Sequence, residues 1–159
     1  MTTRVGVTGH QKLPIAAFPF ILAEFARVLA SASGEVVGLT SLAAGADQLF
    51  ARAVLEGGGR LHAVIPCARY ESAFVDEAAR ASFHELLAAS SDVETLPYDQ
   101  PSAQAFMEAG KRVVDLAELM LAVWDGQAAQ GVGGTADVVH YARAQGREVT
   151  IVWPPGISR

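Results

Sequence analysis

One glycine-rich stretch near the end of the sequence has the composition of a site that holds a phosphate group. The stretch GVGGT, which contains Gly133 and Gly134, ends at Thr135, where a helix is predicted to begin. Amides in the first turn of a helix have no partner within it and carry partial positive charge, so they can bind an anion that reaches the bare main chain. We therefore expect Gly133, Gly134 and Thr135 to contact a phosphate or ribose phosphate. The alternative is a flexible loop followed by a threonine N-cap.

Two earlier turns share this small-residue character and could contact the same ligand. They follow the first two β-rich runs and contain the candidate contacts Thr8, Gly9, His10, Ser41, Gly45 and Asp47. His10 could donate a hydrogen bond to a phosphate or act as an acid or base near neutral pH, or it could cap or pack. Asp47 could accept hydrogen bonds from ribose hydroxyls, or it could only favour the positive end of its helix.

Three further side chains could take part in binding or in hydrolysis. Trp124 ends the most apolar run of the chain, where it could stack on a base or pack in the core. Asp125 follows it and is the best-placed carboxylate for a hydrolytic role, although Asp-Gly is also a common turn. Arg112 could bind a phosphate through its guanidinium group or remain solvated. None of the four histidines has ligand spacing with Cys67, so we expect no metal site.

The candidate turns all follow predicted strands. The predicted strands are Arg4–Gly9, Glu35–Ser41, Arg60–Pro66, Asp92–Pro97, Leu119–Asp125 and Glu148–Pro154. A first helix is predicted to begin at Pro19. Helical periodicity also covers Gly45–Glu56, Tyr70–Ala89, Ser102–Ala117 and Thr135–Gln145. This alternation predicts an α/β fold of the Rossmann-like, doubly wound kind, with a mostly parallel sheet of about six strands and helices on both faces. Such sheets bind ligands outside the carboxyl ends of their strands, so we expect the turns to meet at one rim.

Length and composition limit the classes of function. A chain of 159 residues is most simply one domain spanning 1–159. The net charge of -5, with no basic run, disfavours a nucleic-acid partner. No apolar run approaches the ~20 residues of a membrane span. The single cysteine, Cys67, cannot form an internal disulfide, which is typical of a cytoplasmic protein.

Three motifs together resemble those of a known superfamily. Thr40–Pro66 resembles the small-residue, glycine and aspartate motif of the Rossmann-like DprA domain, and Gly133–Arg143 resembles the glycine–threonine motif of LOG phosphoribohydrolases. Gly6–His10 stands where these proteins have their first ligand turn. In element order, nearly the whole chain is similar to the SMF/DprA–LOG superfamily. The resemblance implies a nucleotide or nucleotide-derived ligand, and with the apolar composition it implies a homodimer. No cofactor is expected.

The resemblance leaves more than one function open. The first hypothesis is a sensor or carrier module that binds the ligand without chemistry. The second is LOG-like hydrolysis of the N-glycosidic bond of a nucleoside 5′-monophosphate, with Asp137 or Asp125 stabilising oxocarbenium charge or activating water and Arg112 holding the phosphate. The glutamate of the LOG motif is replaced by Val138, and Asp137, one position earlier, should point about 100° away on the helix. The third is DprA-like binding of single-stranded DNA.

Overall fold

The computed structural model describes residues 1–128 and 134–159 of the chain. Its strands are β1 (Thr2–Gly9), β2 (Glu35–Thr40), β3 (Arg60–Ile65), β4 (Asp92–Thr95), β5 (Leu119–Val123) and β6 (Glu148–Ile151). Its helices are α1 (Phe18–Ser31), α2 (Ala46–Glu56), α3 (Glu77–Ala88), α4 (Ala103–Leu116) and α5 (Thr135–Ala144), with short 3-10 turns at Ile15–Ala17 and Tyr70–Ala73. The predicted alternation of strands and helices is confirmed.

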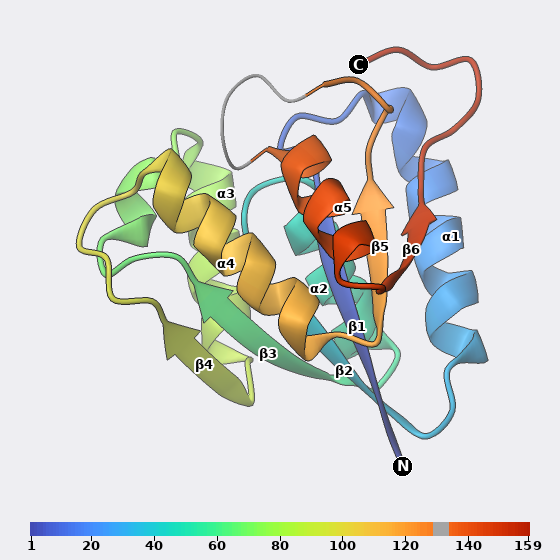
Figure 1. Ribbon diagram of the computed structural model, residues 1–159, viewed down its shortest axis with the longest axis horizontal. Coiled ribbons are helices and arrows are strands. Elements are labelled where there is room, and N and C mark those ends of the chain that lie inside the picture. The colour runs from blue at the N-terminus through green and yellow to red at the C-terminus, as the bar shows by residue number, and fades with distance from the viewer. Residues whose placement is uncertain (129–133) are drawn as a thin grey trace.

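The strands form one parallel sheet in the order β4-β3-β2-β1-β5-β6. The chain builds outward from β1 to β4 on one side and then crosses over to add β5 and β6 on the other (Figure 1). The strand order therefore reverses between β1 and β5, where Gly9 lies opposite Val123. This is the Rossmann-like, doubly wound arrangement that the sequence predicts.

Helices cover both faces of the sheet: α1, α2 and α3 pack on one face, and α4 and α5 lie together on the other (Figure 1). The first interface is built from large buried side chains, among them Ile21, Phe25, Phe50 and Leu121. The second is built mainly from smaller ones, among them Ala109, Val113, Val138 and Ala142. Because both faces of the central strands are buried, β5 and the middle of β1 consist of apolar residues and glycine.

One predicted helix is shorter in the structure than its periodicity indicated. The stretch 70–89 divides into the 3-10 turn Tyr70–Ala73 and the helix α3, which begins at Glu77. Phe74 is extended, and its ring stacks on Phe83 with the ring centroids 5.0 Å apart. Asp76 then caps α3 by accepting a hydrogen bond from the N–H of Ala78 at 3.1 Å. The break is thus fixed by a cap and by aromatic packing, which a helical pattern does not contain.

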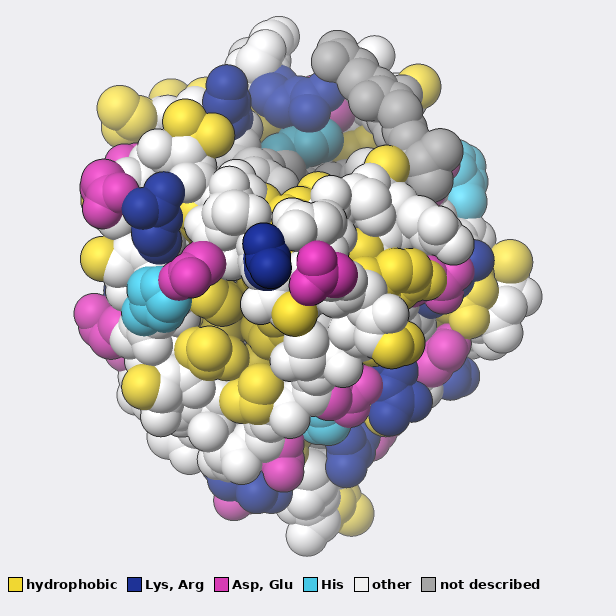
Figure 2. Space-filling model, turned by 90° about the vertical axis from the view of Figure 1, so that its left-hand side faces the viewer, with side chains coloured by type: hydrophobic (Ala, Val, Ile, Leu, Met, Phe, Trp, Pro, Cys, Tyr) yellow, Lys and Arg dark blue, Asp and Glu magenta, His cyan; other side chains and the backbone are white. Residues whose placement is uncertain are grey.

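The molecular surface carries acidic and basic side chains intermixed, as the face in Figure 2 shows. No helix in residues 1–128 and 134–159 has the length and apolar character needed to cross a membrane. The sequence as a whole has a net charge of -5. Exposed charges of both signs interact weakly with one another, so this surface contributes little to the stability of the fold.

The helix α4 begins at a serine cap, which gives a local prediction about stability. Ser102 Oγ accepts a hydrogen bond from the N–H of Ala105 at 3.0 Å. Ser102→Ala removes this acceptor and is expected to lower the free energy of unfolding by about 1 kcal/mol. Urea denaturation measures the loss, and Ser102→Asn, which keeps a capping oxygen, should restore most of it. Equal losses in the two variants would contradict a capping role.

Candidate functional site

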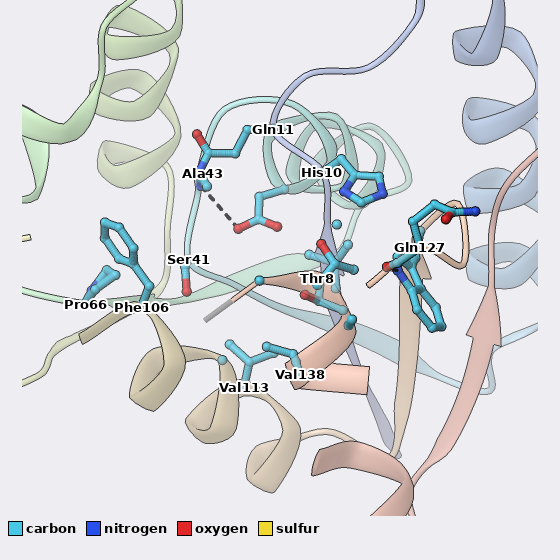
Figure 3. A pocket seen from close by; sticks show the side chains of 18 of the residues that line it. Thr8, His10, Gln11, Ser41, Ala43, Pro66, Phe106, Val113, Gln127 and Val138 are labelled. Carbon is cyan, nitrogen blue, oxygen red and sulfur yellow. Dashed lines mark hydrogen bonds between the residues drawn. The ribbon is translucent and has the colours of Figure 1, made fainter. Parts of the chain in front are cut away.

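A cavity of about 260 Å³ opens at the carboxyl ends of the strands, beside the point where the strand order reverses (Figure 3). The predicted ligand contacts that line it are Thr8, Gly9, His10, Ser41, Asp47, Trp124, Gly134 and Thr135. They come from the ends of β1, β2 and β5 and from the starts of α2 and α5. Gly133 lies outside the described residues. The three turns singled out in the sequence therefore meet at one rim of the sheet.

Gly45 does not line the cavity, but it brings two of these turns together. The N–H of Ala46 donates to the carbonyl oxygen of His10 at 3.1 Å, and the N–H of His10 donates to that of Val123 at 3.2 Å. Gly45 has a φ of 81°, and a Cβ there would lie 2.6 Å from the carbonyl oxygen of His10. A glycine is required because two backbone segments touch here while the chain takes a left-handed conformation.

Asp47 places a buried carboxyl group on the wall of the cavity. Its side chain accepts a hydrogen bond from the N–H of Ala43 at 3.2 Å, drawn as a dashed line in Figure 3. The residue is 7% exposed. Burial raises the pKa of Asp47 to about 7, although hydrogen bonds from Ala43, Ser41 and Thr40 act in the opposite direction. This carboxyl group can therefore accept or release a proton near neutral pH.

His10 is the centre of a second polar cluster. Its Nδ1 lies 2.9 Å from Nη1 of Arg159, and its Nε2 lies 3.2 Å from Oδ1 of Asp125. The N–H of Arg159 faces Nδ1, and the backbone N–H of Asp125 faces Nε2 at 3.3 Å. Because both ring nitrogens face a donor, a second ring proton is disfavoured. Burial and the charge of Arg159 lower the pKa of His10, against the effect of Asp125. The Trp153 ring meets His10 edge-on, with the ring centroids 5.7 Å apart.

Asp125 contacts both His10 and Arg159 but is not among the residues that line the cavity. Its side chain is 9% exposed and lies 3.2 Å from Nε of Arg159. Burial acts to raise the pKa of Asp125, but the N–H of Gln127 and the neighbouring His10 outweigh it, so the pKa is lowered. Asp125 is therefore held in its charged form by three partners and is poorly placed to take a proton from water.

The opposite side of the cavity is apolar. It is lined by Pro66, Tyr70 and Phe106, and Figure 3 shows Pro66 and Phe106 on the side away from His10 and Gln127. Tyr70 is 5% exposed, and its ring centroid lies 6.2 Å from that of Phe106. Neither ring belongs to a turn that the sequence predicts as a ligand contact. Phe106 comes from α4 and Tyr70 from the turn before α3, so only the packed fold brings them together.

Two of the proposed catalytic residues lie elsewhere. Arg112 is not among the residues that line the cavity, and its Nε donates to Glu94 at 2.6 Å. Asp137 is in the first turn of α5, but Val138, the next residue, is the one that lines the cavity. Trp124 does line it, and its indole N–H donates to the carbonyl oxygen of Gln127 at 2.8 Å. In the described part of the chain, no group of three or more His, Cys, Asp or Glu side chains could hold a metal ion.

No protein-family model and no curated protein matches the chain, whereas solved structures do. DNA processing protein A (DprA) from Streptococcus pneumoniae is similar, with a TM-score of 0.70 and 20% identity over 94% of this chain and 50% of that one. DprA from Helicobacter pylori, whose structure concerns single-stranded DNA binding, has a TM-score of 0.67 and 15% identity over 94% and 64%. The LOG-family protein TM1055 has a TM-score of 0.59 and 19% identity over 92% and 72%.

The chain has the fold of the SMF/DprA–LOG superfamily. It spans about half the length of the pneumococcal DprA chain. Within the SMF/DprA–LOG fold, the glycine–threonine motif begins α5 at the rim of the cavity, as the sequence resemblance implied. The position of the LOG glutamate also faces the cavity, but Val138 occupies it. The cavity wall is therefore apolar at this position.

Proposed function

We propose that the protein binds a nucleotide or nucleotide-derived small molecule in this cavity and acts as a sensor or carrier. The main support is the position of the cavity, where three backbone-rich turns meet beside the reversal of strand order. Open parallel sheets bind ligands at this place. The volume of about 260 Å³ is close to the ~300 Å³ lower limit of typical small-molecule sites.

The distribution of side chains matches the parts of such a ligand. Thr135 and Gly134, at the start of α5, offer a hydroxyl group and backbone to a phosphate. Asp47 is placed to accept hydrogen bonds from ribose hydroxyls. Tyr70 and Phe106 give the base an aromatic wall on the other side of the cavity. The proposed ligand therefore has a phosphate, a ribose and a base.

Binding without hydrolysis has more support than LOG-like catalysis. Val138 cannot stabilise an oxocarbenium ion, and Asp137 is not part of the cavity lining. Arg112 pairs with Glu94, so it is not available to hold a 5′-phosphate in this cavity. Single-stranded DNA binding is known for a DprA neighbour. For this chain it has little support, because the net charge is -5 and phosphate backbones require clustered basic side chains.

Binding is tested by calorimetry and differential scanning fluorimetry with nucleoside 5′-monophosphates, cyclic nucleotides and NAD-derived ligands. Thr135→Val, which removes only a hydroxyl group, is expected to weaken phosphate-ligand affinity about tenfold or more, because hydrogen bonds to charged groups contribute about 1.5–3 kcal/mol. Asp137→Asn is the matched control and should leave affinity unchanged. Absence of binding across the panel would overturn the proposal.

The same samples separate binding from catalysis. Chromatography of the wild-type protein incubated with each monophosphate is expected to show no free base. If the wild type releases free base and Asp137→Asn does not, LOG-like hydrolysis would be favoured instead.

We further propose that the protein works in the cytoplasm as a homodimer. Cys67 is a buried free thiol, which suits a reducing compartment. The apolar composition is joined by exposed apolar side chains at Ile15, Val75, Val93 and Ile151. Light scattering coupled to size-exclusion chromatography measures the mass, and a monomer at micromolar concentration would contradict the dimer.

A further inference from the structure

The segment that follows β6 returns to the cavity. The N–H of Val152 extends the sheet by donating to the carbonyl oxygen of Ala122 at 2.8 Å. The chain then turns through Gly156, with a φ of 79°, and the indole N–H of Trp153 donates to the carbonyl oxygen of Ile157 at 2.8 Å. Figure 1 shows this segment passing back over the carboxyl end of β5. As a result, Arg159 lines the same cavity as the β1 turn.

The guanidinium group of Arg159 is held at two of its nitrogens. Nη1 donates to Nδ1 of His10 at 2.9 Å, and Nε lies 3.2 Å from Oδ2 of Asp125. Asp125 is itself fixed, because its Oδ1 accepts the N–H of Gln127 at 3.0 Å. A guanidinium group has five N–H donors, and these two contacts use two of them. The side chain of Arg159 remains 34% exposed, so further donors can reach a ligand.

Arg159 differs in charge from the other described residues that line the cavity. Of the described residues that line it, His10, Asp47, Tyr70 and Arg159 have ionisable side chains, and only Arg159 is permanently positive. Burial lowers the pKa of His10, which keeps the ring uncharged at neutral pH. Arg159 also borders an adjacent hollow that Lys12 lines. The positive charge of the site is therefore concentrated at this one rim.

We infer that Arg159 binds the anionic group of the ligand, with His10 and Asp125 as the positioning residues that hold its guanidinium group. This inference rests on the proposed function and names the side chain that recognises the phosphate ester of the ligand. The planar fork of donors suits two phosphate oxygens at once. Because Asp125 and His10 already restrain the side chain, binding costs less rotamer entropy than it would for a free arginine.

The test compares phosphorylated and unphosphorylated forms of one ligand. Calorimetry measures the affinities of adenosine, guanosine, cytidine and uridine and of their 5′-monophosphates for the wild type, Arg159→Ala and Arg159→Lys. Inorganic phosphate is a separate arm. The wild type is expected to prefer a monophosphate to its nucleoside, and Arg159→Ala should lose about 10- to 100-fold of that preference, as a charge-assisted contact implies. Nucleoside affinity should not change, and Arg159→Lys should retain part of the preference.

A second variant tests positioning. Asp125→Asn should reduce the phosphate preference while nucleoside affinity stays constant, which a loss of folded structure would not do. Arg27→Ala, on the exposed face of α1, removes the same charge elsewhere and should change neither affinity.

The outcomes separate the two proposals. Failure of the wild type to bind any monophosphate would overturn both the proposed function and this inference. If the wild type binds a monophosphate and Arg159→Ala keeps the same preference for the phosphorylated form, the inference alone would be overturned. An equal loss of nucleoside and nucleotide affinity would do the same, because Arg159 would then only support the cavity wall. Binding of inorganic phosphate as tight as that of the nucleotides would show an anion site without a nucleotide ligand.

Discussion

Gly45→Ala is expected to lower the free energy of unfolding by about 2–6 kcal/mol, since backbone strain and overpacking contribute about 1–3 kcal/mol each. Gly45 combines a φ of 81° with a ψ of -124°, a region that side chains with a Cβ avoid. The new Cβ would also lie 2.6 Å from the carbonyl oxygen of His10 and 2.7 Å from the carbonyl carbon of Gln11. Both contacts are backbone, so the β1 turn must move. Urea denaturation measures the loss.

Gly58→Ala provides the matched control for Gly45→Ala. Gly58 has a similar φ of 83°, but a Cβ there would meet nothing within 4 Å. Only the left-handed conformation opposes this substitution, so the expected loss is about 1–2 kcal/mol. Equal losses in the two variants would mean that the added Cβ at Gly45 is accommodated without a steric cost. A larger loss at Gly45 would measure the cost of moving the β1 turn away from the new Cβ.

The fold was predictable because its signals are local. Buried parallel strands such as β5 are apolar at nearly every position, and glycines or capping residues separate them from the helices. The order of elements then restricts the topology to a doubly wound sheet. The break between the 3-10 turn Tyr70–Ala73 and α3 was not predicted, because it depends on Phe74 packing against Phe83. Contacts between distant residues leave no periodic pattern in a sequence.

The site was predictable only where it consists of backbone turns at strand ends. Thr8, Ser41 and Thr135 follow from the rule that parallel strands present their carboxyl ends at one rim. Arg159 does not, because its position depends on the path of the chain after β6. Arg112 was proposed as a phosphate ligand from its guanidinium group and from the LOG resemblance, in which an arginine lies on the helix before the strand that matches β5. In the folded protein the side chain of Arg112, on α4, pairs with Glu94 of β4, with Nε donating to Oε1 at 2.6 Å.

Asp47 is expected to make the wild type lose stability as pH rises toward neutrality, relative to Asp47→Asn. The pKa of Asp47 is about 7 in the folded protein because the group is buried, compared with 3.8 for an ordinary aspartate. Between these values the folded protein binds more protons than the unfolded chain, so its stabilising contribution is complete below pH 3.8 and is lost as pH rises through 7. At about 1.4 kcal/mol for each pH unit, the loss is on the order of 4 kcal/mol.

Other groups titrate in the opposite direction, so the difference between variants is the informative quantity. The pKa of His10 is lowered by burial and by Arg159, and that of Asp125 is lowered by its hydrogen-bond donors. Both contributions make the folded state more stable as pH rises through the range in which the unfolded groups lose their protons. They are common to the wild type and to Asp47→Asn and cancel in the comparison. Asp92→Asn, at an exposed position of β4, makes the same substitution away from the cavity and is the matched control.

Urea denaturation of the three proteins at intervals between pH 4 and pH 8 measures these differences. The advantage of Asp47→Asn over the wild type should grow steadily through this range and level off above the pKa of Asp47. Parallel curves for the two proteins would mean that Asp47 is ionised throughout. The cavity would then present a full negative charge beside Thr8 and Ser41, and a phosphate could bind only at the rim where Arg159 supplies the opposite charge.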